Sequence, residues 1–244
     1  MIRAFRLDMA TMRRARLSNF IVMVALCVAV GFVSKMLPLV FVAAVFMRYP
    51  LSVLSLDMVD ETGTWGAYRL SLPVSRRDCV FGRYLSALAM IGMGLASGLA
   101  AVPILLAASS LASLVGGPLM LDGLPSLPDG FISPSALLAS LLAVCATLFA
   151  GTLMFGVVTP LYYRYGMTKV TLMLPSITVG AVVLAVVVAG GQPDWLASWM
   201  PGLFVWIQSL GHMALTSLAM LMAAAVVFAV SAVVSARLYK RREL

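Results

Sequence analysis

Residues able to bind another protein gather in one polar stretch, which runs from Asp57 to Tyr84 with the sequence DMVDETGTWGAYRLSLPVSRRDCVFGRY. It holds four of the nine acidic residues and four of the seventeen basic ones, between long apolar runs that carry almost none. Asp60 and Glu61 begin its first half and Arg69 lies near the end of that half, which is the order of charge that a helix dipole favours. The chemistry indicated is docking, in which aromatic anchors are flanked by charges that orient a partner.

Proline and serine divide this stretch into two helical pieces. Pro73 interrupts a helix, and Ser75 lies three residues before Asp78, which is a variant of the capping box. The spacing predicts a second helix that begins at Arg76. The two pieces meet at an elbow over 71–74, so a partner that gripped the first piece could push both as a unit.

Residue sets for catalysis or cofactor binding are missing from the sequence. It has one histidine, His212, and three cysteines without a CxxC spacing. The motifs HExxH, GxSxG and the nucleotide-binding GxxxxGK(S/T) are absent as well. We therefore expect no catalytic residue, no metal site and no cofactor on this chain.

The composition is that of a polytopic membrane protein. The 244 residues are 62% hydrophobic and 11% charged, against about 25% charged in soluble domains. Since about 20 apolar residues cross a bilayer as a helix, the apolar runs predict an all-α fold with six transmembrane helices. An amino-terminal interfacial helix and a cytoplasmic helical segment between spans two and three complete the prediction.

Basic residues orient the predicted segments. Sixteen of the seventeen Lys and Arg fall on one side and only Lys35 on the other, so the positive-inside rule makes both termini and the polar stretch cytoplasmic. No nucleic-acid partner is needed to explain the net charge of +8. The single transmembrane domain, 1–244, is divided into a cytoplasmic interfacial helix (1–16), spans one and two (17–56), a cytoplasmic coupling segment (57–83), span three (84–115), an outside loop (116–134), span four (135–161), an inside loop (162–169), span five (170–189), an outside interfacial segment (190–211), span six (212–236) and a cytoplasmic tail (237–244).

Features inside the predicted spans allow more than one interpretation. Arg48 either snorkels near the end of span two, beside Pro50, or lines a substrate path between helices. Gly94 and Gly98 form a GxxxG that permits close helix contact, although glycine is common in membrane helices. Span three is longer than a bilayer requires, so it must tilt, kink or break, for instance at Pro103. No Asp or Glu lies deep in a span, which disfavours an ion-coupled carrier.

The polar stretch with its flank, DMVDETGTWGAYRLSLPVSRRDCVFGRYLSAL, resembles the segment after the second span in permease subunits of bacterial ABC exporters of the ABC-2 type. It is most similar to the small six-span group associated with export of antimicrobial peptides and peptide toxins. Arg6-Leu7-Asp8 also looks like the amino-terminal segment of that group. The likeness rests on an acidic pair, a glycine, aromatic residues and a Leu-Pro-hydroxyl-basic turn, here Asp60, Glu61, Gly63, Trp65, Tyr68, Leu72, Pro73, Ser75, Arg76, Arg77 and Asp78.

The resemblance implies a permease in the bacterial cytoplasmic membrane that forms a homodimer, or a near-identical heterodimer, and pairs with two cytoplasmic P-loop ATPase subunits. The piece from Asp60 to Leu72 would be the coupling helix between spans two and three, seated in a cleft of the ATPase. ATP and magnesium would be bound by the ATPase and not by this chain. Amphipathic peptides would be the exported cargo. The residues assigned to ATPase docking are Asp60, Glu61, Gly63, Trp65, Tyr68, Leu72, Pro73, Ser75, Arg76 and Arg77.

Other functions stay open at this point. A drug or lipid exporter could have the same build. A membrane immunity protein could bind a toxic peptide without moving it. A small membrane enzyme is disfavoured because acid, base and metal sets are missing.

Overall fold

The part of the chain that the structure describes is helical apart from short connections. The computed structural model describes residues 2–11, 13–46, 75–119, 127–128, 131–166, 169, 202, 206 and 209–240. These residues contain no strand, so the predicted all-α class is confirmed for them. The principal helices are α1 (Ile2–Thr11), α2 (Arg13–Ser34), a short unlabelled helix (Leu37–Phe46), α5 (Arg76–Leu119), α6 (Pro134–Tyr165) and α9 (Leu210–Lys240).

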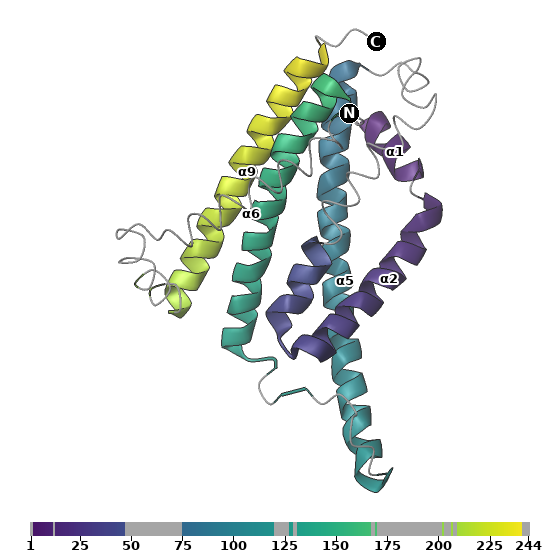
Figure 1. The fold of residues 1–244 in the computed structure, drawn as a ribbon, viewed down its shortest axis with the longest axis vertical. Coiled ribbons are helices and arrows are strands. Elements are labelled where there is room, and N and C mark those ends of the chain that lie inside the picture. The colour runs from purple at the N-terminus through teal and green to yellow at the C-terminus, as the bar shows by residue number, and fades with distance from the viewer. Residues whose placement is uncertain are drawn as a thin grey trace.

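The long helices form a bundle with two distinct ends (Figure 1). α6 and α9 run parallel and side by side, and α5 runs antiparallel next to them. α2 crosses α5, and α1 lies beside the start of α5. We call the end that holds α1, the start of α5 and the last turns of α6 and α9 the α1 end. The opposite end, with the turn after α2 and the starts of α6 and α9, is the Lys35 end.

Four described helices are long and apolar enough to cross a membrane: Leu17–Ser34, Arg77–Leu111, Pro134–Tyr165 and Gly211–Lys240. The predicted spans one, three, four and six fall on these helices. Leu37–Phe46 is apolar but shorter, and the rest of predicted span two lies outside the described residues. Predicted span five, 170–189, lies outside them as well, so the count of six remains a prediction.

A tight turn at Ser34 and Lys35 joins α2 to the short helix. The N–H of Lys35 donates to the carbonyl of Gly31 at 2.9 Å, and the N–H of Met36 donates to Ser34 Oγ at 3.3 Å. Lys35 has a φ of 54°, in the left-handed region where helices usually end on glycine. The turn reverses the chain within two residues and sets the short helix against α2.

α5 begins where the serine cap predicts. Ser75 precedes the first helical residue, Arg76, and its carbonyl accepts the N–H of Cys79 at 3.0 Å. The boundary predicted at 83 therefore falls inside α5, because nothing interrupts the helix once it is capped. Its 44 residues give a length of about 66 Å, and it remains continuous through Pro103. At the Lys35 end it extends past the other helices (Figure 1).

Two apolar cores hold the bundle, one towards each end of α5. The first joins the start of α5 to α6 and α9 through Tyr84, Phe155 and Phe228, whose ring centroids lie 4.9 Å apart for each pair that includes Tyr84. The second joins α2, the short helix and the middle of α5 through Cys27, Val40 and Leu105. α5 belongs to both cores and is the central element of the described fold.

Gly98 lies where the short helix crosses α5. A Cβ at this position would lie 3.0 Å from Phe41 Cδ1 and 3.2 Å from Ala44 Cβ, so only glycine leaves these side chains undisturbed. The helix contact that the GxxxG spacing allows is therefore present at Gly98. Gly92, on the same helix, has no atom within 4 Å of such a Cβ.

We expect Gly98→Leu to lower the thermal stability of the purified protein, whereas Gly92→Leu leaves it unchanged or raises it. The added side chain at Gly98 must displace Phe41, and overpacking of this kind costs about 1–3 kcal/mol. A fluorescence-detected melting curve in detergent measures the difference. Equal melting temperatures for the two variants would contradict the close packing at Gly98.

Candidate functional site

The structure describes only the last part of the predicted docking segment. Ser75 and Arg77 are described with their side chains, and Arg76 is described as the first residue of α5. The other predicted site residues lie outside the described residues: Arg48, Asp60, Glu61, Gly63, Trp65, Tyr68, Leu72 and Pro73. Their assignment to ATPase docking or to a substrate path stays a prediction.

Ser75 and Asp78 form the predicted cap at the start of α5. The Ser75 hydroxyl donates to Asp78 Oδ2 at 2.8 Å, and the Asp78 N–H donates to Ser75 Oγ at 3.1 Å. The second bond satisfies one of the free N–H groups of the first turn. Arg77 is exposed on this turn. α5 therefore begins with a capped first turn that presents a cation.

One helical turn further along α5, a buried charge pair joins α1 to α5. Arg83 Nη1 lies 3.6 Å from Asp8 Oδ2, and the two side chains are 0% and 4% exposed. Ser86 Oγ lies 3.1 Å from the same carboxylate oxygen and 3.0 Å from the carbonyl of Gly82, so its proton is shared between two acceptors. Because both charges are withdrawn from solvent, each depends on the other for its stability.

A glycine lets the two helices approach closely enough for this pairing. A Cβ at Gly82 would lie 2.7 Å from Ala4 Cβ and 3.1 Å from the Phe5 backbone nitrogen. Ala4 and Asp8 are one turn apart and both buried, whereas Arg3 and Arg6 are exposed. α1 is therefore fixed to α5 by its small and acidic face, in addition to any contact with lipid headgroups, which stays a prediction.

Sequence reasoning placed Asp8 in the family resemblance but missed its partners Gly82, Arg83 and Ser86. The available signal was the i, i+4 pair Ala4 and Asp8, a small residue and a lone acid in a basic segment. It did not show which of the many basic residues would pair with that acid, because the two partners are 75 positions apart in the chain.

Basic residues cluster at the α1 end. Arg3, Arg77, Arg164 and Lys240 are exposed on the elements that meet there. Lys35, also exposed, lies at the opposite end. The exposed basic residues named here are thus unevenly distributed along the bundle axis, and the side of the membrane on which each end lies stays a prediction.

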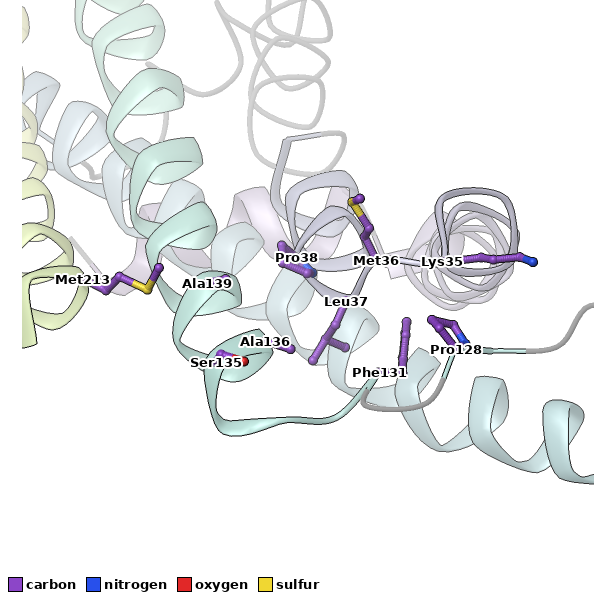
Figure 2. Close-up of a pocket in the computed structure, with 10 residues that line it drawn as sticks. All are labelled: Lys35, Met36, Leu37, Pro38, Pro128, Phe131, Ser135, Ala136, Ala139 and Met213. Carbon is purple, nitrogen blue, oxygen red and sulfur yellow. The ribbon is translucent and has the colours of Figure 1, made fainter. Parts of the chain in front are cut away.

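A pocket of about 390 Å³ opens at the Lys35 end (Figure 2). Met36, Leu37, Phe131 and Met213 make its walls mainly apolar, with the side chains drawn from three separate parts of the chain. Lys35 contributes only its stem, because its ammonium group points away from the other labelled side chains (Figure 2). Such a pocket suits an apolar group and offers little to a charged one.

His212 makes local contacts at the start of α9. Its Nδ1 lies within hydrogen-bond distance of the Ser209 hydroxyl and 2.9 Å from the carbonyl oxygen of Trp206, and its ring stacks on the Trp206 indole at 3.9 Å between centroids. The Trp206 carbonyl can accept a hydrogen bond from His212 only when the imidazole carries its proton on Nδ1. Among the described residues, no group of three or more His, Cys, Asp or Glu is placed to hold a metal ion.

Comparison with known proteins points to one family. Residues 5–115 match the family model described as ABC-2 family transporter protein. The match supports an ABC-2 type permease. It spans the segment from α1 to most of α5 and so includes both partners of the Asp8–Arg83 pair. No curated protein and no solved structure was found to match the chain.

We expect Asp8→Ala to destabilise the protein strongly, by about 3–5 kcal/mol, because it leaves the buried Arg83 guanidinium without its carboxylate. Arg6→Ala is the matched control, since Arg6 lies on the exposed side of the same helix. The measurement is thermal unfolding of the detergent-solubilised protein.

A double variant tests whether the loss comes from keeping the Arg83 charge buried after the Asp8 carboxylate is removed. Asp8→Ala combined with Arg83→Met removes both charges and should recover most of the lost stability. The pair does not hold α1 on α5 if Asp8→Ala has the melting temperature of the wild type. The same follows if the double variant loses as much stability as the two single variants added together.

Proposed function

We propose that this chain is the transmembrane permease subunit of an ATP-driven ABC exporter. The observation that carries the proposal is the ABC-2 family match over residues 5–115. Its support from the structure is the apolar helices long enough to cross a membrane and the capped start of α5, which lies within the polar stretch. Energy would arrive from a separate P-loop ATPase that grips this stretch, with ATP and magnesium bound on that subunit.

The proposed orientation places the α1 end in the cytoplasm. The exposed basic residues at that end support it through the positive-inside rule, as does the position of Lys35 at the other end. The membrane would be the bacterial cytoplasmic membrane, with both termini inside. A second permease copy would complete the transporter.

The proposed cargo is an amphipathic peptide, such as an antimicrobial peptide or a peptide toxin. Support comes from the resemblance of the polar stretch to the peptide-exporting group. The apolar pocket adds to it, because methionine side chains such as Met36 and Met213 adapt to irregular apolar ligands. A drug or lipid exporter of the same build is the alternative within transport, and peptide-stimulated ATPase activity would separate the two.

This chain would do no covalent chemistry of its own. Its sequence supplies no nucleotide-binding loop and no nucleophile with an adjacent base. In the proposed cycle, ATP binding would close the ATPase subunits and move the polar stretch. The attached spans would then rock between inward and outward access.

Loss of the aromatic anchors should release the ATPase. We expect Trp65→Ala combined with Tyr68→Ala to leave the permease folded but to remove the ATPase from a mild-detergent pull-down of tagged protein from its native host. Trp206→Ala is the control, because this exposed indole lies at the other end of the bundle. A P-loop ATPase that co-purifies equally with all three proteins would place docking elsewhere. A folded preparation with no ATPase would favour the immunity-protein alternative.

Surface labelling tests the orientation. Lys35→Cys should react with an impermeant thiol reagent in intact cells, and Lys240→Cys should react only after the cells are opened. Both lysines are exposed, and the three native cysteines are buried, so background labelling should be low. The reverse pattern would overturn the proposed topology.

A further inference from the structure

α6 contains a backbone carbonyl that the helix itself cannot satisfy. Pro160 lies inside α6 and has no N–H, so it cannot donate to the carbonyl of Gly156 four residues earlier. Ser231 of α9 supplies the missing donor, with its Oγ 3.1 Å from the Gly156 oxygen. Gly156 permits the approach, because a Cβ there would lie 3.2 Å from Val227 Cγ1.

The serine that fills this gap is held by a tyrosine of α5. The Tyr84 hydroxyl lies 2.6 Å from Ser231 Oγ and 3.0 Å from Ser235 Oγ. Each hydroxyl has one proton. Ser231 donates its one hydrogen bond to the Gly156 carbonyl. Tyr84 must therefore donate to Ser231, and Ser235 must donate to Tyr84. The bonds form a chain with one direction, from Ser235 through Tyr84 and Ser231 to the carbonyl, in which each bond polarises the next.

The same turn of α6 contains a second buried polar group, the Thr159 hydroxyl. Thr159 is 0% exposed, and among the described residues its hydroxyl has no hydrogen-bond partner. A buried hydroxyl without a partner costs free energy. The turn before Pro160 therefore has two polar groups that α6 does not satisfy, and the described bond that satisfies one of them comes from α9.

We infer that Pro160 makes the last turn of α6 a hinge and that the Ser235–Tyr84–Ser231 hydroxyl chain is the latch that ties this hinge to the start of α5. Tyr84 lies next to Arg83, which binds α1, and nine residues after the Ser75 cap. A shift or rotation of the α5 start would withdraw the Tyr84 hydroxyl, and the bond from Ser231 to the Gly156 carbonyl would lose the donor that polarises and positions it. The last turn of α6 could then bend. That ATP drives this shift rests on the proposed function; the latch and the hinge do not.

A double-mutant cycle on the purified permease alone tests the latch. Ser231→Ala leaves the Gly156 carbonyl without a donor and should lower the melting temperature by about 2–4 °C. Pro160→Ala restores a backbone N–H for that carbonyl, so Ser231→Ala should cost clearly less in the Pro160→Ala background. Thr159→Val is the matched control, because it removes a buried hydroxyl from the same turn outside the chain and should not lower the melting temperature. An equal cost of Ser231→Ala in both backgrounds would show that Ser231 does not serve the proline-freed carbonyl.

Hydrogen exchange tests the hinge. Tyr84→Phe keeps the ring in the aromatic core and removes only the hydroxyl, so it should raise amide exchange several-fold in 161–166 while exchange in 137–150 stays at the wild-type rate. Thr159→Val should leave both regions unchanged. Uniform exchange across α6 in Tyr84→Phe would overturn the hinge.

A functional readout separates this inference from the proposed function. With the ATPase bound, Tyr84→Phe should retain ATP hydrolysis and lose several-fold in cargo moved per ATP. Unchanged cargo per ATP would overturn the role of the latch in coupling. If no ATPase co-purifies with the wild type, the proposed function fails, whereas the melting and exchange results still decide the latch and the hinge.

Discussion

The packing of the described helices depends on a five-residue segment of α5, Gly82 to Ser86. Its glycine lets another helix approach closely, and its polar side chains form hydrogen bonds or an ion pair with other helices. In a bilayer, apolar helix surfaces gain little by leaving lipid for one another, so close approach and internal hydrogen bonds must provide specificity. Gly82 and Arg83 receive α1 through Ala4 and Asp8. Tyr84 bonds α9 and, through Ser231, reaches α6. One short segment therefore fixes the relative position of three other helices.

This arrangement gives the two ends of the bundle different physical properties. At the α1 end the contacts are directional, since a hydrogen bond weakens steeply with angle and a buried charge tolerates little displacement. At the Lys35 end, α5 meets α2 and the short helix through apolar contacts around Gly98 and Leu105, which change gradually as side chains slide. A stiff helix that is held by directional bonds at one end and by apolar contacts at the other is suited to transmit a rotation.

The sequence predicted the elements well and their long-range pairing poorly, for physical reasons. Apolar runs near the length of a bilayer crossing identified α2, α5, α6 and α9, and the Ser75 to Asp78 spacing located the start of α5 because a cap is a local interaction. The Tyr84 to Ser231 bond joins residues 147 positions apart, and nothing in either neighbourhood singles out the partner. The docking residues from Asp60 to Pro73 lie outside the described residues, so for them the resemblance remains the whole argument.

The hydroxyl chain joins the part of the protein that matches the family to the part that does not. The matched residues, 5–115, contain α1, α2 and most of α5, and the Asp8–Arg83 pair lies wholly within them. The two partners of the Tyr84 hydroxyl, Ser231 and Ser235, lie outside them, on α9, and Ser231 in turn bonds α6. If the matched part receives the push from an ATPase, Tyr84 is the hydroxyl through which that push reaches the remaining helices.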